Sequence, residues 1–340
     1  MTTWQKMLHL GDPAFTATVL AREARRRGYD WKVMQWARTP LHTNPLVTKA
    51  HRAARGLAWE AHFAANRARY PLIHLHSALA LPHVKWALGS YALHLHGTDI
   101  RTQQYKPEYR ARILDALDGA AVVYYSTPDI REHTLPLRPD ARLAPVPVAG
   151  STTPLGALPS ELAGRDYVFF TSRWEEVKGG EHQIDTLRAL RSLLPKSVAI
   201  VGMDWGPNAE RARDAGAVLI SKRPYPDYLA VIAGAKAAIG QNSGVMGASE
   251  LDALDLNTPL VAPLNPAWYD GSSPSLVSPP VLGGDLAVDD AEGLALQVLR
   301  ALEAPAPSTH DWIQCHHSPA ATLDVVLAGY AEAFGNPKNQ

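Results

Sequence analysis

The sequence predicts an α/β protein with two domains, each built on a parallel sheet. Strand-like apolar runs alternate with helical patterns along almost the whole chain, and this alternation is typical of βαβ units. The chain has 340 residues, whereas single cores stop growing beyond about 250–300 residues. A segment with four prolines, Ala144–Pro159, separates two series of elements. We therefore expect domains at residues 1–150 and 151–319.

Short apolar, β-branched or aromatic runs predict the strands of the first domain, and helical spacing of apolar residues predicts its helices. The strands are expected at Lys6–Leu10, Trp31–Trp36, Leu72–His76, Tyr91–Leu95, Ala120–Tyr125 and Arg142–Val146. The helices are expected at Ala14–Arg27, Thr48–Arg69 and Glu108–Leu117. Arginines gather at the end of the first of these helices, where cations suit the negative end of the helix dipole.

The second domain repeats the alternation. Strands are expected at Tyr167–Thr171, Ser197–Val201, Ala217–Ile220, Lys236–Ile239 and Pro259–Ala262, and helices at Glu181–Leu194, Asn208–Ala215, Pro226–Ala233 and Met246–Leu256. The segment Leu264–Pro280 is rich in proline and serine, and loops of that length are often lids or binding elements. A last helix is expected at Ala320–Phe334, where the apolar residues form a stripe.

The composition argues against several classes of protein. Lys+Arg and Asp+Glu are equal at 33 each, so no overall basic field would attract nucleic acid or anionic lipid. The single cysteine, Cys315, allows no intrachain disulfide and suits a reducing compartment. No apolar run approaches the roughly 18 residues of a membrane span, and the first residues lack the apolar core of a signal peptide. We expect a cytoplasmic protein without a membrane span and without nucleic acid as a partner.

The segment Tyr167–Gly180 carries the most specific chemistry. Its apolar strand ends in a loop with Arg173 and Lys178, and two glycines precede the next helix. In open α/β sheets, ligands bind beyond the carboxyl ends of the strands. A guanidinium fork and an ammonium group at this place can hold a phosphate or diphosphate. Considered alone, the two cations could equally be solvated loop residues.

Two further segments follow strand ends in the same way. The loop Asn242–Gly247 opens a helix, and exposed amides at a helix start form an anion site. Glu250, one turn into that helix, can reach the vicinal hydroxyls of a ribose. In the first domain a strand ends at the segment His96-Gly97-Thr98-Asp99-Ile100-Arg101, which begins with a glycine turn. His96 is therefore a candidate site residue.

Together these three motifs resemble the family 4 retaining glycosyltransferases of the GT-B fold, which use nucleotide sugars. The resemblance rests on Arg173 with Lys178-Gly179, on the run from Ser249-Glu250 to Val261, and on the His96–Arg101 segment. It implies two Rossmann-like domains that face a cleft, with the helix 320–334 joined to the first domain. It also implies a nucleoside-diphosphate sugar as co-substrate, no further cofactor and no metal ion.

The resemblance assigns roles to individual residues. Arg173 and Lys178 would neutralise the departing diphosphate, and Glu250 would hold the ribose. Further donor contacts would come from Gly11, Arg223, Ser243, Gly244, Val245 and Met246. His96 would contact the sugar, and Asn242, where the family usually has a glutamate, would fix the sugar by hydrogen bonds. Asp99 and Arg101 would lie on the acceptor side, unless they only pair with each other. The nucleotide, the sugar and the acceptor (glycan, lipid, protein or small molecule) stay open.

Two alternatives from other classes also remain. His74-Leu75-His76 and His94-Leu95-His96 each place two imidazoles on one face of a strand, as in metal-dependent hydrolases. Those enzymes arrange their ligands around a closed barrel, however, whereas both pairs here fall in the first of two α/β halves. A non-catalytic protein that binds a sugar nucleotide is the other alternative, because Asn242 is a poor nucleophile. The chain has neither a Gly-x-Gly-x-x-Gly run after a strand nor a P-loop, which argues against a dinucleotide oxidoreductase and a P-loop kinase.

Overall fold

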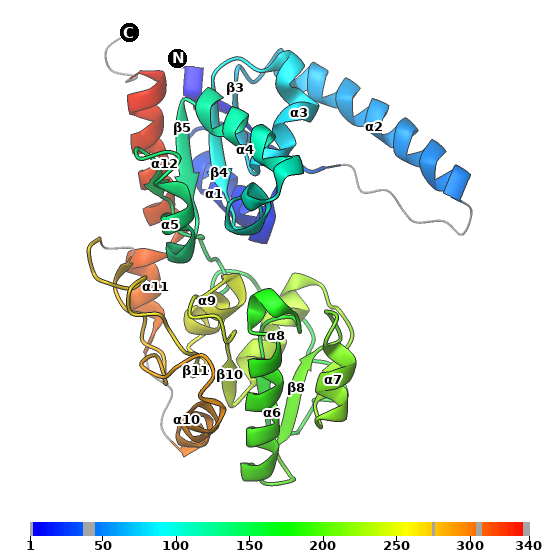
Figure 1. The fold of residues 1–340 in the computed structure, drawn as a ribbon, viewed down its shortest axis with the longest axis vertical. Coiled ribbons are helices and arrows are strands. Elements are labelled where there is room, and N and C mark those ends of the chain that lie inside the picture. The colour runs from blue at the N-terminus through cyan, green and yellow to red at the C-terminus, as the bar shows by residue number, and fades with distance from the viewer. Residues whose placement is uncertain (1–2, 37–44, 274–275, 304–307, 336–340) are drawn as a thin grey trace. The chain divides into compact units, whose positions relative to one another are not determined.

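The computed structural model describes residues 3–36, 45–273, 276–303 and 308–335 of the chain. The chain divides into two compact units (Figure 1). The first unit contains the residues up to Pro147 together with those from Pro319 onward, and the second contains Val148–Ser318. Each unit is built around one parallel sheet, so the predicted fold class is confirmed. Among the described residues, no helix combines the length and apolar character that crossing a membrane would need.

The sheet of the first unit has six parallel strands in the order β2-β1-β3-β4-β5-β6. The strands are β1 Lys6–Leu10, β2 Asp30–Met34, β3 Leu72–Leu75, β4 Tyr91–Leu95, β5 Val122–Tyr125 and β6 Arg142–Leu143. The helices are α1 Thr16–Arg26, α2 Pro45–Arg67, α3 Leu81–Val84, α4 Pro107–Gly119, α5 Arg131–Thr134 and α12 Pro319–Phe334. All six expected strands are present, whereas α3 and α5, of four residues each, are too short for periodicity to reveal.

Alternating side chains give this sheet two different apolar faces. Leu8 and Leu93 belong to a core cluster that includes residues of α2 and α4. Met7 and Ala92 point the other way, into a cluster completed by α1 and by Tyr330 of α12. Figure 1 shows α12 beside β5, with which it is in contact. The last helix therefore belongs to the first unit because its apolar stripe completes this core.

The second unit has five parallel strands in the order β11-β10-β7-β8-β9. The strands are β7 Tyr167–Phe170, β8 Ala199–Met203, β9 Val218–Ile220, β10 Ala237–Ile239 and β11 Leu260–Val261. The helices are α6 Glu181–Leu193, α7 Ala209–Asp214, α8 Tyr225–Gly234, α9 Ala248–Asp255, α10 Ala291–Glu303 and α11 His310–His316. None of the helices predicted from the sequence corresponds to α10 or α11. Residues 274–275 of the predicted loop Leu264–Pro280 lie outside the described residues.

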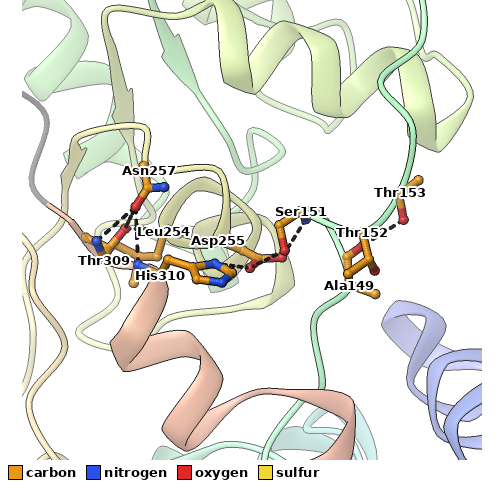
Figure 2. A network of polar contacts seen from close by, with 9 residues as sticks. All are labelled: Ala149, Ser151, Thr152, Thr153, Leu254, Asp255, Asn257, Thr309 and His310. Atoms are coloured by element: carbon orange, nitrogen blue, oxygen red, sulfur yellow. Dashed lines mark hydrogen bonds and ion pairs between the residues drawn. The ribbon is translucent and has the colours of Figure 1, made fainter.

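A polar network anchors the first residues of the second unit to α9 and α11 (Figure 2). The backbone N–H and the hydroxyl of Ser151 donate to the carboxylate of Asp255 at 2.7 and 2.9 Å, and His310 lies 3.5 Å from the same carboxylate. Asn257, with a left-handed φ of 55°, accepts from the N–H groups of Thr309 and His310. The proline-rich segment expected to be a linker is thus tied at this end by specific hydrogen bonds.

Each sheet has one point where the strand order reverses. In the first unit the chain leaves β1 towards β2 and leaves β3 towards β4, on opposite sides. In the second unit the chain leaves β7 towards β8 and β10 towards β11, again on opposite sides. In such sheets a ligand crevice forms beyond the carboxyl ends of the two strands at the reversal. The loops after β1, β3, β7 and β10 are therefore the places to look for a site.

Candidate functional site

The loops after β7 and β10, which flank the reversal in the second sheet, are in contact. The backbone N–H of Asn242 donates to the carbonyl of Lys178 at 3.0 Å. Gly179 permits this approach, because its φ is +111° and a Cβ there would lie 2.6 Å from the Cβ of Asn242. The structure thus brings together two of the three motifs that the sequence singled out.

Lys178 reaches the start of α9. A Cβ added to Gly247, the residue before the helix, would lie 3.8 Å from Nζ of Lys178 and 3.3 Å from a carboxylate oxygen of Glu250. The half-buried ammonium therefore lies beside the first turn of α9. The N–H groups of a first helical turn carry partial positive charge and lack acceptors within the helix. Two features that favour an anion converge here.

Arg173 is oriented by two neighbours. Its Nε donates to the carboxylate of Glu175, and its guanidinium carbon lies 5.2 Å from the centre of the Trp205 ring. Nζ of Lys222 lies 4.5 Å from the same ring. Trp205 follows β8 and Lys222 follows β9, so the loops of three neighbouring strands form this cluster.

Trp205 belongs to this cluster but is not among the site residues predicted from the sequence. It is 46% exposed although it lies only two residues beyond the largely buried strand β8, and an isolated aromatic residue near a strand end was the available signal. An exposed indole can stack on a planar ring of a ligand. Arg223, a predicted donor contact in the loop after β9, forms an ion pair with Glu161 at 3.1 Å.

The loop before α9 offers fewer free amides than predicted. The N–H of Met246 donates to the hydroxyl of Tyr269 at 3.1 Å, and that of Gly247 donates to the carboxylate of Glu250 at 2.9 Å. The hydroxyl oxygen of Ser243 is buried and has no hydrogen-bond partner among the described residues. An anion at this place would accept hydrogen bonds from the N–H groups in the first turn of α9 rather than from the N–H of Met246.

Glu250 has a structural role at the start of α9. The residue is buried, with an exposed fraction of 2%. Its carboxylate accepts hydrogen bonds from the N–H of Gly247 at 2.9 Å, the N–H of Gln241 at 3.1 Å and the hydroxyl of Thr171 at 3.2 Å. Glu250 therefore caps α9 and ties it to β7 and β10. A carboxylate has about four acceptor positions, so contact with a ribose stays a prediction.

Asn242 is also buried. Its Nδ2 donates to the hydroxyl of Thr186 in α6 at 3.0 Å and to the carbonyl of Val288 at 3.2 Å. Val245 nearby is buried as well, and Gly244, with a φ of +76°, forms the turn between them. Asn242 thus fastens its loop to α6. Its Oδ1 has no hydrogen-bond partner among the described residues, and the predicted hydrogen bond to a sugar stays a prediction.

In the first unit Gly11 lies in the turn after β1, at the reversal of that sheet. Its φ is +85°, and a Cβ would lie 2.6 Å from Nε1 of Trp36 and 3.6 Å from Cβ of His76. Only glycine fits this turn without strain. The absence of a Cβ at Gly11 allows the Trp36 side chain to approach the turn closely. A contact of Gly11 with the sugar-nucleotide donor stays a prediction.

Asp99 and Arg101 do not pair with each other. Asp99 is buried and accepts from the N–H groups of Ala78 and Ile100 at 3.0 Å each, and its burial raises the pKa of its carboxyl group. Arg101 donates to the carboxylate of Asp129 at 2.7 Å. Both side chains therefore hold the segment after β4 in place, and the acceptor contacts predicted for them remain untested.

His96 belongs to a cluster of five histidines on one face of the first sheet. His9 comes from β1, His74 and His76 from the end of β3, and His94 and His96 from the end of β4. All five occupy alternate positions, so they share the face that packs against α1 and α12. His9 and His74 are direct neighbours in the strand register.

Hydrogen bonds connect four of these rings to partners. Nδ1 of His9 lies 3.0 Å from Nε2 of His76, and Nδ1 of His76 lies 2.9 Å from Nε2 of His96. Nδ1 of His74 is bonded to the hydroxyl of Tyr330. Among the described residues, no hydrogen bond of normal geometry reaches either ring nitrogen of His94.

Burial keeps the whole cluster uncharged. It lowers the pKa of His9 and of His94 to about 3, in the second case against a smaller opposing effect of the Ala144 backbone. Burial, aided by the neighbouring imidazoles, also lowers the pKa of His74, His76 and His96 well below the ordinary value. Neutral imidazoles are metal ligands.

Two groups of three histidines are close enough to be considered as a metal site. In the group His9, His74 and His76, and in the group His76, His94 and His96, ligand atoms lie within 4.8 Å of one another. Both groups consist of histidines alone and share His76. The metal-dependent alternative therefore has a defined location in the first unit.

Comparisons with known proteins establish the fold. No family model matches the sequence, and a search of curated proteins finds no match. The structure aligns with HepE from Anabaena in complex with UDP-glucose, at 12% identity over 96% of this chain and 99% of that chain, with a TM-score of 0.67. It also aligns with sucrose-phosphate synthase from Thermosynechococcus elongatus, at 17% identity, 97% and 99% coverage and a TM-score of 0.63.

A protein of another class shares this similarity. A protein from Listeria monocytogenes assigned as a UDP-N-acetylglucosamine 2-epimerase aligns at 13% identity over 97% of this chain and 96% of that chain, with a TM-score of 0.58. At such identities a structural match shows the fold and not the reaction. The protein therefore has the GT-B fold that was predicted, and its chemistry must be argued from the site.

Proposed function

We propose that the protein is a glycosyltransferase that moves a sugar from a nucleoside-diphosphate sugar to an acceptor. The observation that carries this proposal is the convergence of Lys178 and the first turn of α9 at the strand reversal of the second unit. The similar structure of HepE is a complex with UDP-glucose, and a trehalose-phosphate synthase of similar structure, from Burkholderia xenovorans, is described as UDP-forming. These neighbours support a nucleotide sugar as the ligand of this fold.

In this proposal the second unit stabilises the leaving group. Breaking the bond between the sugar and the diphosphate places negative charge on the phosphate oxygens, and donors already in position lower the barrier. Lys178 and the amides of α9 are two such donors. Arg173 uses one N–H for Glu175, and its other N–H groups would donate to phosphate oxygens. Trp205 would offer its ring to the planar base.

We further propose that transfer retains the anomeric configuration and needs no metal ion. Asn242 cannot supply a nucleophilic carboxylate, because it is a neutral amide bonded to Thr186 and Val288. The acceptor oxygen then bonds to the anomeric carbon as the bond to the phosphate breaks, and the acceptor's proton passes to the departing phosphate oxygen. Attack on the face from which the phosphate leaves preserves the configuration. His96 is the proposed contact to the sugar.

A thermal-shift screen of nucleoside diphosphates and their sugar conjugates tests the proposal. A ligand at 100 times its dissociation constant adds roughly 2.7 kcal/mol of stability, so a true donor should stand out. The stabilising conjugate is then incubated with candidate acceptors, and release of the nucleoside diphosphate is measured. The proposal fails if no nucleotide stabilises the protein.

Product analysis separates the other functions. Conversion of the sugar nucleotide into its epimer without an acceptor would point to the chemistry assigned to the Listeria neighbour. Binding without turnover would support a non-catalytic sugar-nucleotide-binding protein. Stoichiometric zinc, manganese or iron in the purified protein would support the metal-dependent alternative at the histidine cluster.

A further inference from the structure

Three of the clustered histidines form a hydrogen-bonded row. The ring centres of His9 and His76 lie 5.3 Å apart and their bonded nitrogens 3.0 Å apart, and the corresponding distances for His76 and His96 are 5.2 and 2.9 Å. With ring bonds of about 1.33 Å, a ring nitrogen lies about 1.1 Å from the ring centre. These values agree only if both hydrogen bonds run along the line that joins the ring centres. Planes tilted by only 32° and 23° fit this geometry.

The row uses both nitrogens of His76. Nε2 faces His9 and Nδ1 faces His96, so His76 has no lone pair left for a metal ion while the row is intact. Because His76 belongs to both candidate metal groups, metal binding in either group would have to break the row. The arrangement as it stands therefore favours a hydrogen-bonded chain over a metal centre.

In a row of hydrogen-bonded neutral imidazoles, the tautomer of each ring depends on the tautomers of its neighbours. Each neutral ring carries one N–H and one lone pair, and the hydrogen bond on one side decides which nitrogen holds the proton. In this row every ring must donate in the same direction, either towards His96 or towards His9. The tautomer of His96 is therefore decided by its neighbours and not by the solvent.

The surroundings of His9 and His96, at the two ends of the row, indicate in which direction the rings donate their hydrogen bonds. Nε2 of His9 is buried without a hydrogen-bond partner among the described residues. Nδ1 of His96 does not share this condition, because it is either accessible or hydrogen-bonded. An N–H on Nε2 of His9 would be an orphaned buried donor, and such donors are rare in folded proteins. A lone pair at this end leaves each ring donating towards His96, whose own proton is then on Nδ1.

We propose that His9 and His76 are positioning residues that hold His96 with its proton on Nδ1, as a neutral hydrogen-bond donor to an oxygen of the substrate. The row ends at His9, since in the described part of the chain Nε2 of His9 has no partner that could supply a proton. The row therefore orients and polarises the donor of His96 and does not carry protons to or from it. The contact with substrate rests on the proposed glycosyltransferase function, whereas the tautomer does not.

Nitrogen NMR of the full-length protein with labelled histidines reads the tautomer directly. In the wild type we expect a protonated Nδ1 and an unprotonated Nε2 for His96. His76→Phe removes the donor to Nε2 and should release His96 into a mixture of tautomers. His76→Gln, whose amide can accept from His9 and donate to His96, should preserve the wild-type signal. His94→Leu is the control within the cluster, because neither hydrogen bond of the row involves His94.

Transfer kinetics complete the test. Loss of an oriented donor should lower kcat by about tenfold in His76→Phe, and His76→Gln should restore most of it. A wild-type His96 protonated on Nε2, or an unchanged signal in His76→Phe, would overturn the proposal, as would a metal ion bound stoichiometrically by these rings. If the NMR result is as expected but the protein binds no nucleotide, the row is confirmed and the proposed function fails.

Discussion

The most direct test of the site is Lys178→Met, which removes the ammonium and keeps an apolar stem of similar length. Nζ lies 3.8 Å from the Cβ position at Gly247, so a phosphate oxygen at the first turn of α9 would lie at a comparable distance. Two unit charges about 4 Å apart interact by about 4 kcal/mol at an effective dielectric constant near 20. A hydrogen bond to a charged group contributes about 1.5–3 kcal/mol. We therefore expect kcat to fall by about two orders of magnitude.

The stability of this variant should change little. Lys178 is only half-buried, and surface substitutions away from special features usually alter stability by less than about 0.5 kcal/mol. Initial rates of nucleoside diphosphate release at saturating donor, together with a thermal melt, measure both effects. Calorimetry with the nucleoside diphosphate alone shows how much of the loss is already present in ground-state binding.

Lys236→Met is the matched control. Lys236 is exposed, pairs with Asp166 at 3.2 Å and directly precedes β10, so it lies at the amino edge of the same sheet. The chemical change is identical, but no proposed phosphate contact is lost, and kcat should stay at the wild-type value. Wild-type turnover in Lys178→Met would refute the assignment of the leaving-group site, and an equal loss in both variants would show a general effect of charge.

Three further variants and one product analysis follow from the structure. Glu250→Gln should lower the free energy of unfolding by about 1–3 kcal/mol in urea, because a capping carboxylate is lost; it should also weaken nucleotide binding in calorimetry, and unchanged affinity would limit Glu250 to capping. Gly179→Ala should cost roughly 1–3 kcal/mol through backbone strain, and wild-type stability would contradict the close approach to Asn242. Burial raises the pKa of Asp252 to about 7, so the folded protein holds a proton that the unfolded chain releases above its ordinary pKa. Stability should therefore fall as pH rises from about 4 to about 7, by up to about 4 kcal/mol, and Asp252→Asn should abolish this dependence in denaturation at several pH values. Proton NMR of the first-formed product should show the anomeric configuration of the donor, and an inverted product would exclude the retaining mechanism.

Most strands could be predicted because their signal is local. β1 and β4 are apolar runs that end at glycine turns or polar residues, and both begin and end at the predicted residues. The predicted second strand runs to Trp36, but β2 ends at Met34, and Trp36 packs against Gly11 instead. That contact joins two loops and leaves no local pattern.

The missed helices had different causes. α10 carries buried apolar residues at helical spacing, among them Leu294 and Val298, and this signal could have revealed it. α11 has only one buried apolar residue, Ile313, and is held by the hydrogen bonds of Thr309 and His310 to Asn257. Contacts of this kind are decided by the tertiary structure.

The sequence predicted the kind of chemistry at the candidate site, and the structure shows how the side chains are arranged there. The sequence identified Arg173 and Lys178 because cations at a strand end suggest phosphate, and the structure places Lys178 beside a helix start. The predicted ligand contact of Glu250 rests on a match to the family motif, and that of Asn242 on its position in the motif, where the family usually has a glutamate. In the structure both are buried, and Nδ2 of Asn242 and the carboxylate of Glu250 bond to protein partners, which a one-dimensional pattern does not show.

The sequence by itself determined which residues can share a face and which loops carry charge, because strand alternation and helical spacing are properties of neighbouring residues. It thus paired His74 with His76 and His94 with His96, each on one strand. Only the tertiary structure placed β1 beside β3. Nδ1 of His9 therefore lies 3.0 Å from Nε2 of His76, a residue 67 positions further along the chain. Strand order and register depend on the packing of whole helices against both sheet faces, including α12 from the far end of the sequence. Those contacts are long-range, and no local pattern encodes them.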